Sequence, residues 1–335
     1  MDARFRSLQR SLAERLGALA SPLDATLPAL EVAPLTSDAP RLVASQVIEK
    51  GGVHRAWRVD GEPTPGFGAF LDGTQRSHVL TYVDGVPIIA GTVAAVIRRR
   101  IGARLTTWGR GPLVRQRLYA PRAVLPSLAW TALEEQSGAD ALVDTTSPEH
   151  GDTPAGHPFA LAERAVHLVQ DDREQAELEL AERWCALEHA PLFVDGGISG
   201  VASGHPHEPL PTCLVGVVKS HRTLHVEGDA LRTVLGLRRG SRSSVFRVVS
   251  SRRRPVASWY LRLRDPAGRD PMWGLIRVEA ADHAPGDPLE ALSERADEVS
   301  RWILAEAAPL SLPDARWDKM VYGIRDCEEF LRAVC

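Results

Sequence analysis

Two aspartate-glycine pairs, each at the end of an apolar run, are the residues of this 335-residue chain best suited to chemistry. Asp72 follows Phe70-Leu71, and Asp195 follows Leu192-Phe193-Val194. An aspartate at the end of a buried strand presents a carboxylate at the sheet edge, and a glycine after it leaves room for a ligand. Two such carboxylates converging on a hard divalent cation suit phosphodiester hydrolysis. The alternative is two ordinary strand-to-turn junctions, because Asp-Gly is a common turn dipeptide.

Positive charge is supplied almost entirely by arginine and is segregated along the chain. The net charge is −3, yet no acidic residue lies between Asp229 and Asp265. This interval predicts a DNA-binding surface on Arg238, Arg239, Arg252, Arg253 and Arg254. A second basic region runs from 98 to 122. The alternative for both is a solvated charged face.

Several classes of protein are disfavoured by the composition. No apolar run reaches the length of a membrane span and the N-terminus lacks a signal-peptide core, so we expect a cytosolic protein with no membrane partner. The four cysteines lack CxxC spacing, which argues against a zinc knuckle or a disulfide framework. No Walker-type phosphate loop and no GxSxG motif occur, so ATP-driven motion would need a partner.

Hydrophobic periodicity predicts a mixed order of strands and helices. Strands are expected at 68–72, 77–83, 86–97, 192–195, 213–219, 244–249, 256–263 and 273–278. Helices are expected at 2–20, 126–137, 159–187, 229–237, 288–307 and from 326 to the end. This order indicates a mixed α/β (α+β) fold. We divide the chain into an N-terminal helical and extended segment, 1–64, and one domain, 65–335.

The arrangement of carboxylates follows the logic of a ribonuclease H-like site, and the sequence resembles the NurA family of DNA end-resection nucleases. The resemblance rests on FLDGT (70–74), LFVDGGISG (192–200), LVGVVKSHR (214–222) and the tail WDKMVYGIRDCEEFL (317–331). It covers about residues 65–335. It implies a ribonuclease H-like central mixed sheet flanked by helices, and a metal-dependent DNA nuclease that uses Mn²⁺ or Mg²⁺.

The resemblance also implies the site residues. Asp72 and Asp195 match the family's metal-binding aspartates, and Lys219 falls where the family has a lysine after its next strand. A helical glutamate is expected about five turns before Asp195, which favours Glu177, with Glu174 as the alternative. A further ligand is expected after Tyr322-Gly323; Asp326 is our prediction, with Glu328 and Glu329 as alternatives.

The implied partners are DNA ends, single-stranded DNA and a HerA-type hexameric ATPase, and the implied assembly is a homodimer.

The chemistry of the residue types also suits the site, independently of the resemblance. Lys219, as a compact point charge, could neutralise a phosphate or orient a water. It could equally be an ordinary strand-end lysine. Glu177 could instead lie on an exposed helix face beside Arg173 and Arg183. The rival function is a non-catalytic adaptor of the same fold that binds DNA or the ATPase without cutting.

Overall fold

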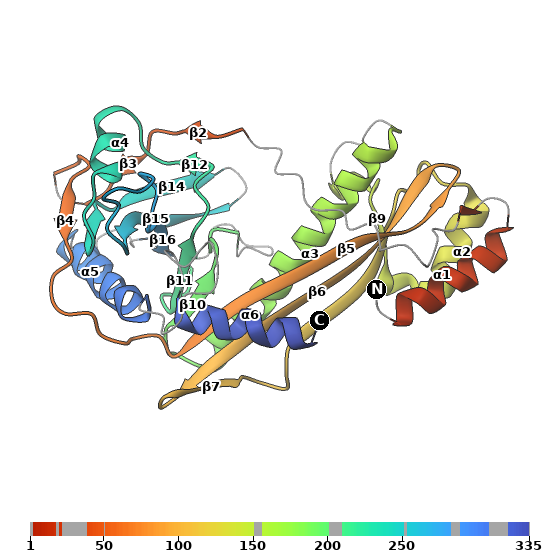
Figure 1. Ribbon diagram of the computed structural model, residues 1–335, viewed down its shortest axis with the longest axis horizontal. Helices are drawn as coiled ribbons and strands as arrows, with labels where there is room; N and C mark the ends of the chain where they lie inside the picture. Colours follow the sequence, from red (N-terminus) through yellow and green to blue (C-terminus); the bar gives the residue numbers. More distant parts are fainter. Residues whose placement is uncertain are drawn as a thin grey trace.

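The computed structural model describes residues 3–17, 20–21, 39–49, 51–150, 156–200, 210–250, 253–282, 289–307 and 321–334. In these ranges a large mixed sheet carries helices on both faces (Figure 1). Among the helices described, none is long and apolar enough to cross a bilayer.

The central strands of the sheet position the candidate site. Their order is β8 (Leu113–Ala120), β6 (Val86–Ile101), β5 (Ala69–Val83), β10 (Leu192–Asp195) and β11 (Leu214–Val218). β5 is antiparallel to β6, and β6 to β8. On its other side β5 is parallel to β10, which is parallel to β11. The long helix α3 (Pro158–Leu187) leads into β10 and supplies a crossover of the length that parallel pairing requires.

β5 corrects the sequence prediction, because the strands expected at 68–72 and 77–83 form one continuous strand. Asp72 pairs with Val96 of β6 and Gly73 with Ala95, so this Asp-Gly pair lies within the strand and does not end it. A tight turn at Asp84-Gly85 joins β5 to β6, and both residues have positive φ, 49° and 78°.

β8 and β9 (Leu142–Asp144) are absent from the sequence prediction. The apolar pattern of β8 is interrupted by charged residues, which hides the strand. Arg115 and Arg117 form ion pairs with Glu179 and Asp172 of α3, so these charges face the helix that covers the sheet.

Beyond β11 the sheet continues through antiparallel pairs to an exposed edge. The further strands are β16 (Leu275–Ala281), β15 (Arg253–Arg262), β14 (Phe246–Ser250) and β3 (Gln46–Val47). β13 (Ser241–Ser243) pairs with β15 on one side and with β4 (Ala56–Arg58) on the other. A separate two-stranded parallel sheet joins β2 (Arg41–Leu42) to β12 (Thr223–Leu224).

The two faces of the sheet are covered by different helices. Phe70 and Phe193 face the core formed with α5 (Leu289–Glu306) and α6 (Tyr322–Val334). Leu71 and Val194, the next residues along the same strands, face α3. This alternation is the period of two that a strand imposes, and it places Asp72 and Asp195 on the α6 side.

The far end of the long β5–β6 hairpin carries its own apolar cluster. Helices α1 (Ala3–Leu16) and α2 (Ser127–Ser137) pack there, at the opposite end of the molecule from β4 (Figure 1). The remaining described elements are β1 (Ala20–Ser21), β7 (Arg104–Thr107), α4 (Gly228–Leu235) and the short 3₁₀ helices Ala139–Ala141 and Pro148–His150.

The predicted fold class, a mixed α/β fold with a central mixed sheet flanked by helices, is confirmed. The division at residue 64 stays a prediction. The described parts of the 1–64 segment join the rest of the fold: α1 packs on α2, and β3 and β4 extend the large sheet. The C-terminal helix begins at Tyr322, four residues before the predicted start.

Candidate active site

Asp72 and Asp195 lie on neighbouring parallel strands. Leu71 of β5 pairs with Val194 of β10, so the two aspartates occupy the next position in register. The chain turns away after Asp195, where Gly196 has φ of +124° and donates its N–H to Val217. A side chain at Gly196 would be strained at this φ. The sequence interpretation of an Asp-Gly turn is therefore right for Asp195 and wrong for Asp72.

Gly73 serves to admit Glu177 from α3. A Cβ added at Gly73 would lie 2.2 Å from Oε1 of Glu177, far inside contact distance. The missing side chain thus lets Glu177 of α3 lie directly on the backbone of β5 at the position that follows Asp72. Glu177 is mostly buried and is ion-paired with Arg173 one turn earlier on α3.

Helix α6 brings a third carboxylate to the two aspartates. One carboxylate oxygen each from Asp72, Asp195 and Glu328 lie within 4.8 Å of one another. The helix is held against β5 by close contacts: Cys327 donates to the carbonyl oxygen of Phe70 at 3.4 Å, and Gly323 lies directly on the Phe70 ring. Glu328, next to the anchored Cys327, is thereby directed to the aspartates.

Asp326, the residue predicted for this position, forms an ion pair with Arg98 of β6. Glu329 pairs with Arg325 and is exposed. Of the three carboxylates considered for the C-terminal ligand, the structure therefore brings Glu328 to Asp72 and Asp195.

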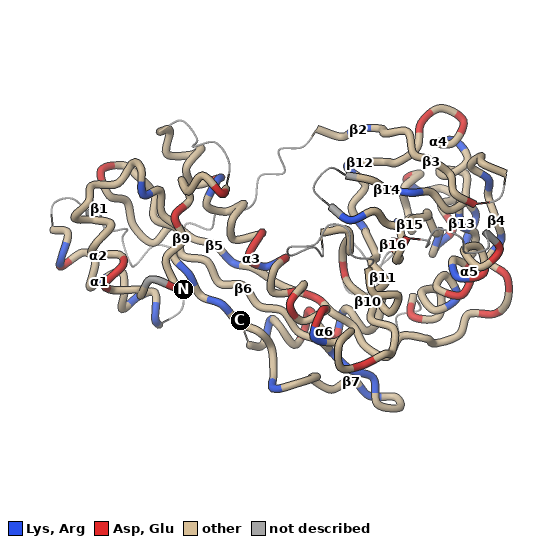
Figure 2. The backbone as a smooth tube through the Cα atoms, turned by 180° about the vertical axis from the view of Figure 1, so that it is seen from behind, with Lys and Arg blue, Asp and Glu red and all other residues tan. Residues whose placement is uncertain are grey.

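Three cations accompany these carboxylates. Lys219 Nζ lies 2.8 Å from Oδ1 and 2.9 Å from Oδ2 of Asp195. Arg173 bonds Glu177 and also donates to Gln75 at 3.0 Å. Arg332, one turn after Glu328 on α6, lies 3.7 Å from it. Acidic and basic positions alternate closely around α6 in Figure 2.

Burial and mutual repulsion perturb the acids. Burial is the main cause that raises the pKa of Asp72 to about 8, and the nearby Asp195 and Glu177 raise it further, whereas Lys219 opposes the rise. Burial likewise raises the pKa of Glu177 to about 7, against the lowering effect of Arg173. Crowded carboxylates that resist ionisation are characteristic of sites that receive a proton or a cation.

Two cavities flank the carboxylates. One, of about 330 Å³, lies on the α6 side and is lined by Asp72, Thr74, Glu328 and Arg332 among others. The second, of about 290 Å³, lies between α3 and the segment after β10, and is lined by Glu174, Glu177, Gly197 and Gly200 among others. Asp195 and Arg173 line both, so the two cavities border the same two side chains.

The segment after Asp195 is held by a buried glutamate that the sequence interpretation missed. Glu279 of β16 is 1% exposed and accepts the N–H groups of Ile198 at 2.8 Å and Ser199 at 3.4 Å. Arg277 pairs with the same carboxylate at 2.5 Å. A Cβ at Gly197 would come within 3.0 Å of it. Only the pair of glycines after Asp195 hinted at such a close approach.

Glu174, the alternative helical glutamate, has a side chain that is 41% exposed and accepts a hydrogen bond from Gln170. Glu177 is therefore the helical glutamate nearer the aspartates. Arg238 and Arg239 are exposed in the turn before β13, and Arg254 is mostly buried. Arg252 and the side chain of Arg253 lie outside the described residues. The DNA-binding role of these arginines stays a prediction.

Comparison with known proteins finds a likeness among solved structures. No protein-family model and no curated protein matches the chain. Among solved structures, the chain is similar to the NurA nuclease from Sulfolobus solfataricus, with a TM-score of 0.44 and 11% sequence identity. The likeness covers 83% of this chain and 86% of that one.

Proposed function

We propose that this chain is a divalent-metal-dependent deoxyribonuclease that hydrolyses phosphodiester bonds. The observation that carries the proposal is the convergence of Asp72, Asp195 and Glu328 from three different elements, with their oxygens within 4.8 Å. An all-carboxylate set of oxygen donors suits Mg²⁺ or Mn²⁺. We propose Asp72, Asp195 and Glu328 as ligands, and Glu177 as a fourth carboxylate on the other side of β5.

A divalent cation held there would supply Lewis acidity to the phosphoryl group and lower the pKa of a bound water. Two side chains of the protein would act beside the cation. Lys219, with its ammonium on Asp195, is placed to share its charge with a phosphate oxygen. Arg173 fixes Glu177 through its ion pair and the bond to Gln75, which keeps that carboxylate over Gly73.

The substrate and partners follow from the motif resemblance and belong to the proposal. We propose action on DNA ends and single strands during end resection in DNA repair, together with a HerA-type hexameric ATPase and as a homodimer. The support is the order of FLDGT, LFVDGGISG and LVGVVKSHR with the tail WDKMVYGIRDCEEFL.

The test is digestion of end-labelled linear and single-stranded DNA with Mn²⁺, Mg²⁺ or EDTA. Asp72→Asn and Asp195→Asn should each lower metal-dependent cutting by about 100-fold or more, because a carboxylate ligand to the cation is lost. Asp140→Asn, an exposed aspartate outside the site, is the matched control and should cut like wild type.

The rival function, a non-catalytic adaptor, predicts a different outcome. In that case no metal supports cutting, alone or with the ATPase, while DNA is still bound. Cutting that persists in EDTA or in both aspartate variants would also overturn the proposal.

A further inference from the structure

The edge formed by β4 and β13 gathers exposed arginines from two distant parts of the sequence. Arg58 pairs across the strands with Ser241, directly after the turn that carries Arg238 and Arg239. Arg55 precedes β4. We call Arg55, Trp57, Arg58, Arg238 and Arg239 the edge surface; all five side chains are exposed. The sequence interpretation included Arg238 and Arg239 but not the residues of β4.

The two segments that form this edge surface contain no acidic residue. The chain has no Asp or Glu from 51 to 59 or from 236 to 247. Within the described residues no ion pair involves the side chains of Arg55, Arg58, Arg238 or Arg239. The nearest acids in sequence, Asp60 and Glu62, follow the end of β4. These arginines contrast with those beside the carboxylates, which are ion-paired, and remain available to an external polyanion.

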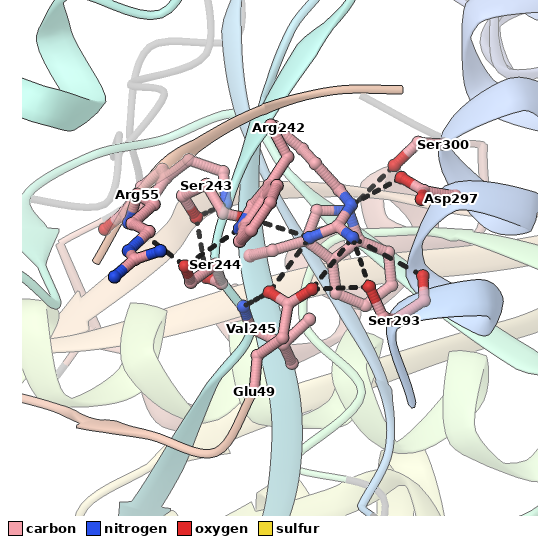
Figure 3. A network of polar contacts seen from close by, with 12 residues as sticks. Glu49, Arg55, Arg242, Ser243, Ser244, Val245, Ser293, Asp297 and Ser300 are labelled. Atoms are coloured by element: carbon pink, nitrogen blue, oxygen red, sulfur yellow. Dashed lines mark hydrogen bonds and ion pairs between the residues drawn. The ribbon is translucent and has the colours of Figure 1, made fainter. Parts of the chain in front are cut away.

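A network of ion pairs and hydrogen bonds lies beneath the edge surface (Figure 3). Arg242 of β13 is 1% exposed and pairs with Glu49 at 3.0 Å and with Asp297 of α5 at 2.6 Å. Ser293 donates to the same Glu49 carboxylate. These bonds tie β13 to α5 and to the segment after β3, so the backbone that carries the neighbouring arginines is held in place.

Trp57 adds an aromatic face to the edge surface. Its ring is held by a bond from Nε1 to Ser244 at 3.1 Å, and 37% of the residue is exposed. An anchored, partly exposed indole between arginines is the combination that binds single-stranded nucleic acid, since unpaired bases stack on aromatic rings while arginine contacts phosphate.

The sheet register gives the separation between the edge surface and the carboxylates. From Asp195, the row of paired residues runs through Val217, Val278 and Trp259. Extending the pairs Arg242–Leu261 and Trp57–Arg242 by two residues continues this row to Ser244 and Arg55. Asp72 and β13 are thus five strand spacings apart, roughly 24 Å along the sheet. The row between them is buried under α5, so a strand that joins the two sites has to pass beside this helix. Trp57, two residues on from Arg55, lies toward the same ends of the strands as Lys219.

We propose that the edge surface is a second binding site for single-stranded DNA, which holds the strand whose scissile phosphate lies at Asp72 and Asp195. The site-to-site path is an inference that rests on the proposed nuclease function; the binding itself does not. Phosphates of one strand in a duplex are 3.4 Å apart along the axis, so 24 Å corresponds to about seven stacked nucleotides, and an extended single strand spans it with fewer. We expect an oligonucleotide of four nucleotides to engage one site and one of twenty to engage both.

The first experiment measures binding without cutting. Fluorescence anisotropy with a labelled dT20 and a labelled dT4 is read across a salt series, with Asp72→Asn as the background. Arg58→Gln/Arg239→Gln should weaken dT20 binding and reduce the slope of log K against log salt by about 1.4, since each phosphate contact contributes about 0.7 on a single strand. Trp57→Leu should weaken dT20 binding about tenfold.

Matched controls remove the same charge elsewhere. Arg6→Gln/Arg10→Gln changes two exposed arginines of α1, at the opposite end of the molecule, and should leave the slope unchanged. Because both arginine pairs are exposed, these variants are expected to fold, and thermal unfolding verifies this. The proposal is overturned if the two double variants have equal slopes, or if Trp57→Leu and wild type bind dT20 equally.

The second experiment separates this proposal from the nuclease function. With metal present, the preference for dT20 over dT4, measured as the ratio of kcat/KM values, should fall about tenfold in the double variant of the edge surface. An unchanged ratio overturns the second site and leaves the nuclease intact. Absence of cutting in every protein overturns the nuclease function, while the anisotropy result still decides whether the edge surface binds DNA.

Discussion

Gly73 and Glu177 form one unit, because the glutamate occupies the space that a side chain at 73 would fill. We predict that Gly73→Ala lowers metal-dependent cutting by about 10- to 100-fold, since the added methyl displaces a carboxylate near the cation. Cutting rates of Gly73→Ala, Glu177→Ala and the double variant form a cycle. If the methyl acts through Glu177, the double variant loses no more activity than Glu177→Ala alone. Fully additive losses would contradict this coupling.

The raised pKa values of Asp72 and Glu177 predict how stability depends on pH. Their folded-state pKa values, about 8 and about 7, lie above those of ordinary carboxyls. Between about pH 4 and pH 8 the folded metal-free protein therefore binds more protons than the unfolded chain, and its stability falls as pH rises. We expect Asp72→Asn to raise Tm at pH 8.5 by about 5 °C and to leave it nearly unchanged at pH 4.

Metal should reverse that trend. A divalent cation binds the deprotonated carboxylates, so its stabilising effect should grow as pH rises through the same window. Calorimetric scans of wild type with and without Mg²⁺ at pH 5.5 and pH 8.5 measure this. An increase in Tm that is equal at both pH values would contradict the raised pKa of the buried acids.

At the scale of single elements, α6 shows what periodicity can and cannot predict. Helix α3 and strand β10 are read well from the sequence, because their apolar residues recur at the helical and strand periods. The choice among Asp326, Glu328 and Glu329 depends on the rotation of α6 against β5, which Gly323 and Cys327 fix by contacts over 250 residues away in sequence. Local patterns carry no information on such contacts. Likewise Asp72 lies mid-strand because Gly73 pairs with β6, which the dipeptide alone does not reveal.

The orientation of α6 predicts different effects for its acids. Glu328→Gln should weaken Mn²⁺ binding by about tenfold or more, because it removes one of three converging oxygen donors. Asp326→Asn removes the partner of Arg98 and should reduce thermal stability more than metal affinity. Isothermal titration with Mn²⁺ measures the first effect and thermal unfolding the second. Glu329→Gln, which alters an exposed acid of the same helix, is the control. Stronger loss of Mn²⁺ binding in Asp326→Asn than in Glu328→Gln would restore Asp326 as the ligand.

At the scale of the whole molecule, distant segments complete one another's cores. Glu49 lies within the 1–64 segment, yet its carboxylate bonds Arg242 and the N–H of Val245 and is 4% exposed. Phe5, Leu12 and Leu16 of α1 are buried against the far end of the β5–β6 hairpin. The sequence analysis sets residues 1–64 apart as a helical and extended segment. Pairing of a few short strands with distant parts of the chain leaves no local signature that would have indicated otherwise.

These contacts predict that residues 65–335 do not fold stably alone. Removal of 1–64 leaves Arg242 buried with Asp297 but without Glu49, and exposes the apolar face that α1 covers. Losing one partner of a buried ion pair costs about 3–5 kcal/mol, a large share of the stability of an ordinary domain. Full-length Glu49→Gln tests the ion pair separately and should lose a similar amount in denaturant unfolding, whereas Arg15→Gln, which breaks an exposed pair with Glu135, should lose at most about 1 kcal/mol. A truncated chain that unfolds cooperatively at the wild-type temperature would show instead that 1–64 is a separable extension.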